Sequence, residues 1–102
     1  MLVPYSARLR TGEVLAVTGD LDDGAEELLR QDLRTFTGDH ALGLTVDLTD
    51  VTFFPSAAIS VVASALKASE RQGAELRLQA ASASVAARVL HLCGMPFVTP
   101  EN

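Results

Sequence analysis

The spacing of hydrophobic residues changes several times along the chain, and each change predicts a new structural element. Residues 1–20 hold two short apolar segments on either side of Thr11 and Gly12, which is typical of a β-hairpin with a tight turn. Residues 42–48 alternate apolar and polar side chains, which predicts a strand with one buried face. Residues 76–79 show a shorter version of the same alternation. Four strands are therefore expected before residue 80.

Three other segments, residues 22–36, 56–72 and 82–93, place their hydrophobic residues at helical spacing. Glycines follow each segment, as is common just past the end of a helix. Polar residues near the first and third starts are expected to cap these helices. The expected caps are Asp22 or Asp23 and Ser82 or Ser84, and the expected buried stripes are Ala25, Leu28, Leu29, Leu33 and Phe36; Ile59, Val62, Ala63 and Leu66; and Val85, Val89, Leu92 and Cys93.

The predicted order of elements is β-β-α-β-α-β-α, with one more short strand in the segment "MPFVTP". Helices between strands imply crossover connections, which are right-handed, and a partly parallel sheet. The alternation within the strands favours a sheet that is buried mainly on one face. We therefore predict an α/β fold with a mixed sheet of four to five strands and about three helices mainly on one face. A single domain is expected over residues 1–102.

The charge balance excludes some classes of function. Thirteen acidic residues stand against eight basic ones, which gives a net charge of −5 and no basic cluster. A nucleic-acid-binding domain normally presents a basic face, so no direct nucleic acid partner is expected. An acidic surface favours protein partners. No apolar run approaches the ~20 residues that span a membrane, and the first ten residues lack the pattern of a signal peptide. A cytoplasmic protein without direct membrane contact is expected.

The residue types that usually carry catalysis are sparse. The two histidines, His40 and His91, are far apart in the sequence, and Cys93 is the only cysteine. His91 is expected on the solvent side of the third helix, and Cys93 is expected to be buried in its apolar stripe. Neither a phosphate-binding glycine loop nor a nucleophile elbow is present. We expect no metal, no cofactor and no enzymatic activity.

Ser56 stands where a predicted strand turns into a predicted helix, in the segment "VTFFPSAAISVV". The first turn of a helix has free backbone N–H groups and the positive end of the helix dipole. A serine there can cap the helix, and a phosphate on its hydroxyl would also be stabilised. The residues alone leave both interpretations open.

Three segments in order resemble the STAS domain family, and in particular the anti-sigma factor antagonists of bacteria. They are "VTGDLDDGAEELLRQDL", "LTVDLTDVTFFPSAAISVV" and "QGAELRLQAASASVAARVLHLCGM". The resemblance runs from about Tyr5 to Val98. It implies the STAS fold and a regulator in a partner-switching system that controls transcription. In that family the unphosphorylated protein binds an anti-sigma factor that is also a serine kinase, and phosphorylation breaks the complex.

The resemblance also implies roles for particular residues. Ser56 matches the phosphoacceptor, Asp22 matches an acidic residue near the phosphorylation site, and Asp47 matches a strand position that is often Asp or Asn. Around Ser56 the chain departs from the family pattern. Pro55 replaces an acidic residue just before the serine, Ala57 replaces a second Ser or Thr, and Ala58 replaces a glycine. The partner-binding or switch segment implied in this way consists of Asp22, Asp47, Phe54, Pro55, Ser56, Ala57, Ala58 and Ile59.

Two alternative functions fit the same resemblance. Small STAS proteins also act as accessory subunits of ABC-type phospholipid transporters, and other STAS domains sense small ligands or nucleotides.

The sequence given ends at Asn102, where many members of the family continue into a final helix. An apolar face left exposed there would favour a homodimer.

Overall fold

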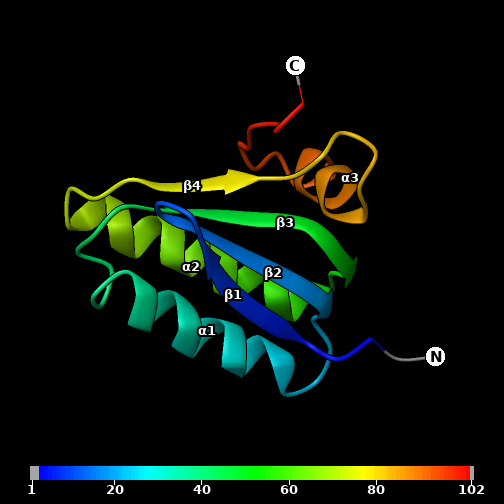
Figure 1. Cartoon of the computed structure of the whole chain (residues 1–102), viewed down its shortest axis with the longest axis horizontal. Helices are drawn as coiled ribbons and strands as arrows, with labels where there is room; N and C mark the ends of the chain where they lie inside the picture. The colour runs from blue at the N-terminus through cyan, green and yellow to red at the C-terminus, as the bar shows by residue number, and fades with distance from the viewer. Residues whose placement is uncertain (1–2, 102) are drawn as a thin grey trace.

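The computed structural model describes residues 3–101 as one sheet with three helices (Figure 1). Within that range, none of the helices is both long and apolar enough to cross a bilayer. The elements are β1 (Ser6–Arg10), β2 (Val14–Asp20), α1 (Ala25–Phe36), β3 (Leu44–Phe53), α2 (Ser56–Arg71), β4 (Leu76–Gln79) and α3 (Val85–Leu92).

The sheet has the order β1-β2-β3-β4. β1 runs antiparallel to β2, and β2, β3 and β4 run parallel to one another. Gly12 has a φ of 76°, as the turn between β1 and β2 requires. The predicted α/β class, element order and mixed sheet are therefore confirmed. The sheet has four strands, within the predicted four to five, because the expected last strand is reduced to one parallel bridge between Gln79 and Val98.

The main core lies between one face of the sheet and the pair α1 and α2, which contact each other; in Figure 1, α2 is seen behind the strands and α1 below them. Strand side chains pointing to this face are buried, whereas their neighbours Thr45 and Arg77 remain partly or fully exposed. This period-2 division follows from the pleat of the strands. The core includes Leu15, Val17, Leu44, Val46, Leu76 and Leu78 from the sheet and Leu29, Leu33, Val61, Val62 and Ala65 from the two helices.

The first two helices begin differently from the prediction. Gly24 is the N-cap of α1 and Pro55 is the N-cap of α2, and neither start has a side-chain cap. The expectation that Asp22 or Asp23 caps α1 is therefore wrong. Pro55 is extended, with φ −79° and ψ 170°, so Ser56 becomes the first helical residue and does not cap α2. The buried residues also differ in part: Leu28 is exposed, and the buried face of α2 consists of Ala58, Val61, Val62, Ala65 and Ser69.

α3 lies on the opposite side from α1 and α2 in Figure 1, and it contacts β3. The predicted cap Ser84 is confirmed, because its hydroxyl accepts a hydrogen bond of 3.0 Å from the N–H of Ala87. The predicted apolar stripe is wrong in part: Val89 packs against the core, but Cys93 and Val85 are exposed and Leu92 is 77% exposed. The buried residues are Ala86, Ala87 and Leu90. A helix of eight residues rich in apolar side chains offers several apolar faces, and contact with β3 selects the one whose small alanines permit close approach.

Candidate functional site

The carboxyl ends of β2 and β3 meet at one edge of the sheet because the two strands are parallel. The N–H of Leu21 donates a 2.9 Å hydrogen bond to the carbonyl of Phe53. The hydroxyl of Thr52 donates to the carboxylate of Asp20. These bonds hold the loop after β2 against the connection between β3 and α2. Asp22 and Ser56, which are far apart in the sequence, therefore belong to the same edge.

Gly19 allows the N-terminal segment to cross this edge. Its φ is +93°, and a Cβ atom there would lie 2.1 Å from the carbonyl oxygen of Pro4. The carbonyl of Val3 accepts a 2.8 Å hydrogen bond from the N–H of Asp20, and the Asp20 carboxylate accepts one of 3.1 Å from the N–H of Val3. Only glycine has both the backbone freedom and the absence of a side chain that this contact requires.

Ser56 is exposed at the first position of α2. The carbonyl of Pro55 accepts 3.0 Å hydrogen bonds from the N–H groups of Ala58 and Ile59. The first turn contains no acidic side chain, and within residues 3–101 the N–H groups of Ser56 and Ala57 have no protein acceptor. The positive end of the helix dipole is thus open to solvent beside the Ser56 hydroxyl, an arrangement that favours an anion such as a phosphoryl group.

The other residues of the predicted switch segment differ in how far they are exposed to solvent. Phe54 is 5% exposed and Ala58 is 0% exposed, so both belong to the core beneath the segment. Pro55, Ile59 and Asp22 are half-buried, and Ala57 is exposed. The structure therefore brings only part of the predicted set to the surface.

Phe53 was missed by the sequence reasoning, although it is 51% exposed at this edge. An exposed aromatic side chain of this kind is typical of a protein-binding surface. Phe53 and Phe54 are adjacent in the sequence, and no local signal distinguishes the exposed ring from the buried one. We use the name "edge surface" for Phe53, Ser56 and Ala57 together with the half-buried Asp22 and Ile59.

A match to the STAS domain family covers residues 6–100. The chain belongs to the STAS domain family. This match spans every strand and helix described above, and it includes the residues of the edge surface. No curated protein matches the sequence significantly.

Solved structures show the same fold. An anti-sigma factor antagonist from Mycobacterium paratuberculosis is similar with a TM-score of 0.73 and 21% identity, covering 97% of this chain and 86% of that one. Unphosphorylated SpoIIAA gives a TM-score of 0.71 at 18% identity, covering 97% and 90%. The phosphorylated Bacillus SpoIIAA gives 0.67 at 20% identity, covering 97% and 93%. At these identities the likeness establishes the fold of this STAS domain.

Asp47, the remaining predicted site residue, is a buried residue of β3 in this STAS domain. Its carboxylate pairs with the guanidinium of Arg10 on β1, although β2 lies between β1 and β3 in the sheet. It also accepts a 3.0 Å hydrogen bond from the N–H of Thr49, where the register of β3 shifts. The Thr49 hydroxyl accepts 2.9 Å from the N–H of Ala81. These contacts tie β1, β3 and the loop before α3 together.

Burial alone would raise the pKa of the Asp47 carboxyl, but its hydrogen bonds and ion pair lower it overall. The hydroxyl and N–H of Thr49 and the guanidinium of Arg10 all stabilise the carboxylate. A carboxyl whose pKa is lower in the folded state stabilises the fold above its unfolded pKa of 3.8. This stabilisation is lost as the pH falls through the folded-state pKa. The contacts therefore give Asp47 a structural role.

Asp47→Asn is expected to lower the free energy of unfolding at pH 7 by about 2 kcal/mol, because a hydrogen-bonded charge is removed from a nearly buried position. The difference from wild type should shrink as the pH falls from 7 to below 3.8 and through the folded-state pKa, because the wild-type carboxyl then becomes protonated as well. Urea unfolding of both proteins at several pH values in this range measures the difference in the free energy of unfolding. Asp39→Asn is the matched control, since its pair with Arg34 is exposed and should change stability by less than about 0.5 kcal/mol. A pH-independent loss at position 47 would contradict the assignment.

The other residues with reactive side chains lie apart from the edge surface. His40 follows α1, and His91 and Cys93 lie at the exposed end of α3. Within residues 3–101, no group of three His, Cys, Asp or Glu side chains is placed to hold a metal ion.

Proposed function

We propose that this STAS domain is an anti-sigma factor antagonist that binds an anti-sigma factor through the edge surface. Phosphorylation of Ser56 by a serine kinase partner would control this binding. The observation that carries the proposal is the exposed Ser56 hydroxyl at the open N-terminus of α2, beside the loop after β2. The shared fold with solved anti-sigma factor antagonists supports it.

The physical basis of the switch is a change in charge at the centre of a docking surface. Bare Ser56, Phe53 and Ala57 form a nearly uncharged area that a partner can cover at low desolvation cost. A phosphoryl group adds about −1.5 to −2 charges, which the helix N-terminus stabilises in the free protein. Covering that charge with a partner requires its removal from water, which costs several kcal/mol unless the partner pairs it. The proposed role is regulatory and non-enzymatic.

The departures from the family pattern are compatible with this role. Pro55 has no N–H, but the N-cap position needs no donor because its carbonyl makes the first helical bonds. The methyl group of Ala58 is fully buried, so it adds no bulk to the surface that a partner would contact. Ala57 has no hydroxyl where the family pattern has a second Ser or Thr, so Ser56 is the single candidate phosphoacceptor at the helix start.

Incubation with ATP and the kinase recovered as a binding partner should add one phosphoryl group to the wild-type protein and none to Ser56→Ala. Intact mass spectrometry measures the change. Ser60→Ala, which alters another exposed serine of α2, is the control and should be modified like wild type. Modification of Ser56→Ala at the wild-type level would exclude Ser56 as the acceptor.

Affinity capture from the host identifies the partner independently of modification. Recovery of an anti-sigma factor by the wild-type protein supports the proposal. Recovery of a transporter ATPase instead would favour the accessory-subunit function and contradict the antagonist role. Capture in parallel with Phe53→Ala should lose the partner if the edge surface is the docking site, because truncating an aromatic anchor commonly costs at least about 2 kcal/mol.

A further inference from the structure

A second surface feature lies between α1 and α2, on the helical side of the molecule. A cavity of about 340 Å³ is lined by residues of both helices and by the loop that follows α1. Its volume falls in the range of small-molecule sites. Its inner wall is apolar and includes Leu33, Val61 and Ala65, which also belong to the core.

The rim of this cavity is positively charged on a protein that is acidic overall. Three of the eight basic residues line it, namely Arg30, Arg34 and Arg71, against one carboxylate, that of Asp39. Arg34 pairs with Asp39 at 3.0 Å, and Arg30 pairs with Glu27 at 3.2 Å. Within residues 3–101, Arg71 has no carboxylate partner. The lining thus keeps a positive excess and one unpaired guanidinium.

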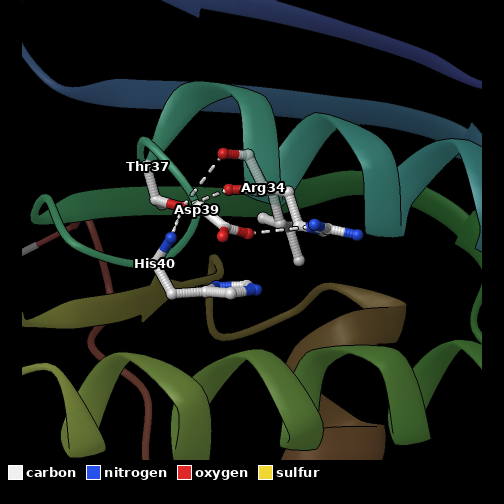
Figure 2. Close-up of polar contacts among 5 residues, drawn as sticks. Arg34, Thr37, Asp39 and His40 are labelled. Carbon is white, nitrogen blue, oxygen red and sulfur yellow. Dashed lines mark hydrogen bonds and ion pairs between the residues drawn. The ribbon is translucent and has the colours of Figure 1, made fainter.

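The loop after α1 holds His40 in the cavity wall in a strained conformation. Asp39 and His40 have positive φ values of 61° and 72°, which are uncommon for residues other than glycine. The buried hydroxyl of Thr37 accepts a 2.8 Å hydrogen bond from the N–H of His40 and donates to the carbonyl of Leu33. Figure 2 shows the imidazole extending from this loop into the space between the two helices. Such strain persists only where surrounding contacts enforce it, and it is often found at binding sites.

The imidazole of His40 also has an unmet hydrogen-bonding capacity. Its Nδ1 atom is buried and has no partner among the described residues. An unsatisfied buried nitrogen is costly, and a bound group that pairs with it would remove that cost. Because His40 lines the cavity, a ring N–H of its imidazole can donate to an anion there, and the nearby guanidinium groups can bind the same anion.

We propose that the cavity between α1 and α2 binds a small organic anion, with its phosphate or carboxylate held by Arg71, Arg34 and His40 and its apolar body against Leu33, Val61 and Ala65. The apolar wall and the cationic rim together select this class over a bare inorganic ion or a neutral molecule. The site is built from residues outside the edge surface. It therefore stands independently of the proposed antagonist function.

Titration of the full chain with phenyl phosphate and, separately, with benzoate tests the proposal and distinguishes the two anionic groups. At least one probe should shift the amide NMR signals of residues 37–42 and of the second half of α2 in a saturable manner. A dissociation constant of about 1 mM or tighter is expected. Inorganic phosphate should bind at least about 10-fold more weakly, because it lacks an apolar body. Benzyl alcohol should not saturate, because it lacks the charge.

Arg71→Gln should weaken binding of the better probe by about 10-fold, and His40→Asn by about 5-fold, since each removes one hydrogen-bond donor to the anion. Asparagine tolerates the positive φ at position 40. Arg88→Gln is the matched control, because Arg88 is an exposed helical arginine outside the cavity, and it should change affinity by less than about 2-fold.

Several results would overturn the proposal. They are the absence of saturable shifts up to about 20 mM probe, shifts confined to another surface, equal binding of benzyl alcohol, or equal weakening by Arg88→Gln. Equal affinity for inorganic phosphate would overturn the part of the proposal that concerns the apolar body. Circular dichroism of each variant ensures that a lost signal reflects the site and not a lost fold.

Discussion

Ser56→Glu is expected to weaken binding of the anti-sigma partner by about 100-fold while the melting temperature changes by less than about 2 °C. The side chain is exposed, and a carboxylate at the N-terminus of a helix interacts favourably with the helix dipole, so the free protein tolerates the charge. In the complex the same carboxylate would be covered near the centre of the edge surface. Leaving one buried charge unpaired in an interface costs about 2–5 kcal/mol.

The acidic neighbours of Ser56 should reinforce the effect. Asp20 is the last residue of β2 and Asp22 lies in the loop after it, which is hydrogen-bonded to the end of β3. Their carboxylates add negative charge beside the uncharged area formed by Phe53, Ser56 and Ala57. A carboxylate added at position 56 increases the negative charge at this edge, and more charge makes the edge costlier to cover with a partner. The carboxylate of Ser56→Glu thus adds negative charge at the same position in the interface as a phosphoryl group on Ser56 would.

Ala83→Glu provides the matched control for Ser56→Glu. Ala83 is exposed just before the N-cap of α3, so the variant adds the same charge near another helix start, away from the edge surface. Its partner affinity, measured by isothermal titration calorimetry, should stay within about 2-fold of wild type. Wild-type affinity for Ser56→Glu, or an equal loss for Ala83→Glu, would show that the docking surface lies elsewhere.

Gly19→Ala is expected to lower the free energy of unfolding by about 3 kcal/mol and the melting temperature by about 15 °C. The added Cβ atom would lie 2.1 Å from the carbonyl oxygen of Pro4, a separation that real Cβ atoms do not adopt. Relief requires the N-terminal segment to move, which would break its hydrogen bonds with Asp20. Asp20 in turn bonds to Thr52 on β3, so the edge surface should lose order as well.

Gly12→Ala separates backbone strain from steric overlap. Gly12 also has a positive φ, of 76°, but a Cβ atom there would have no neighbour within 4 Å. Only the conformational cost remains, about 1 kcal/mol. Thermal unfolding followed by circular dichroism compares the two variants. Equal losses would mean that the contact with Pro4 contributes nothing beyond strain.

Much of the fold could be predicted from local sequence patterns. The strand alternation around Leu44 and Val46, the cap at Ser84 and the glycines that follow the helices are local signals, and the structure confirms them. The capping residues of α1 and α2 could not be predicted in this way. The choice between Pro55 and Ser56 depends on where the chain leaves β3, and β3 ends where its pairing with β2 ends.

Burial within the short last helix needed tertiary information. Leu90 and Leu92 are equally apolar, yet one is 0% and the other 77% exposed. Their difference arises from contact with β3, which lies more than thirty residues away in the sequence. Phe53 and Phe54 differ in the same way: they are identical in type, yet one is 51% and the other 5% exposed.

The sequence by itself determined the type and order of the seven elements and the position of Ser56 at the start of a helix. These follow from side-chain periodicity and turn residues, which act over only a few positions. The tertiary structure decided which groups meet: Asp47 with Arg10 across 37 residues, the loop after β2 with Phe53, and His40 with the arginines of two helices. Contacts between residues so far apart in the sequence depend on strand register and helix packing, which arise only when the whole core is assembled.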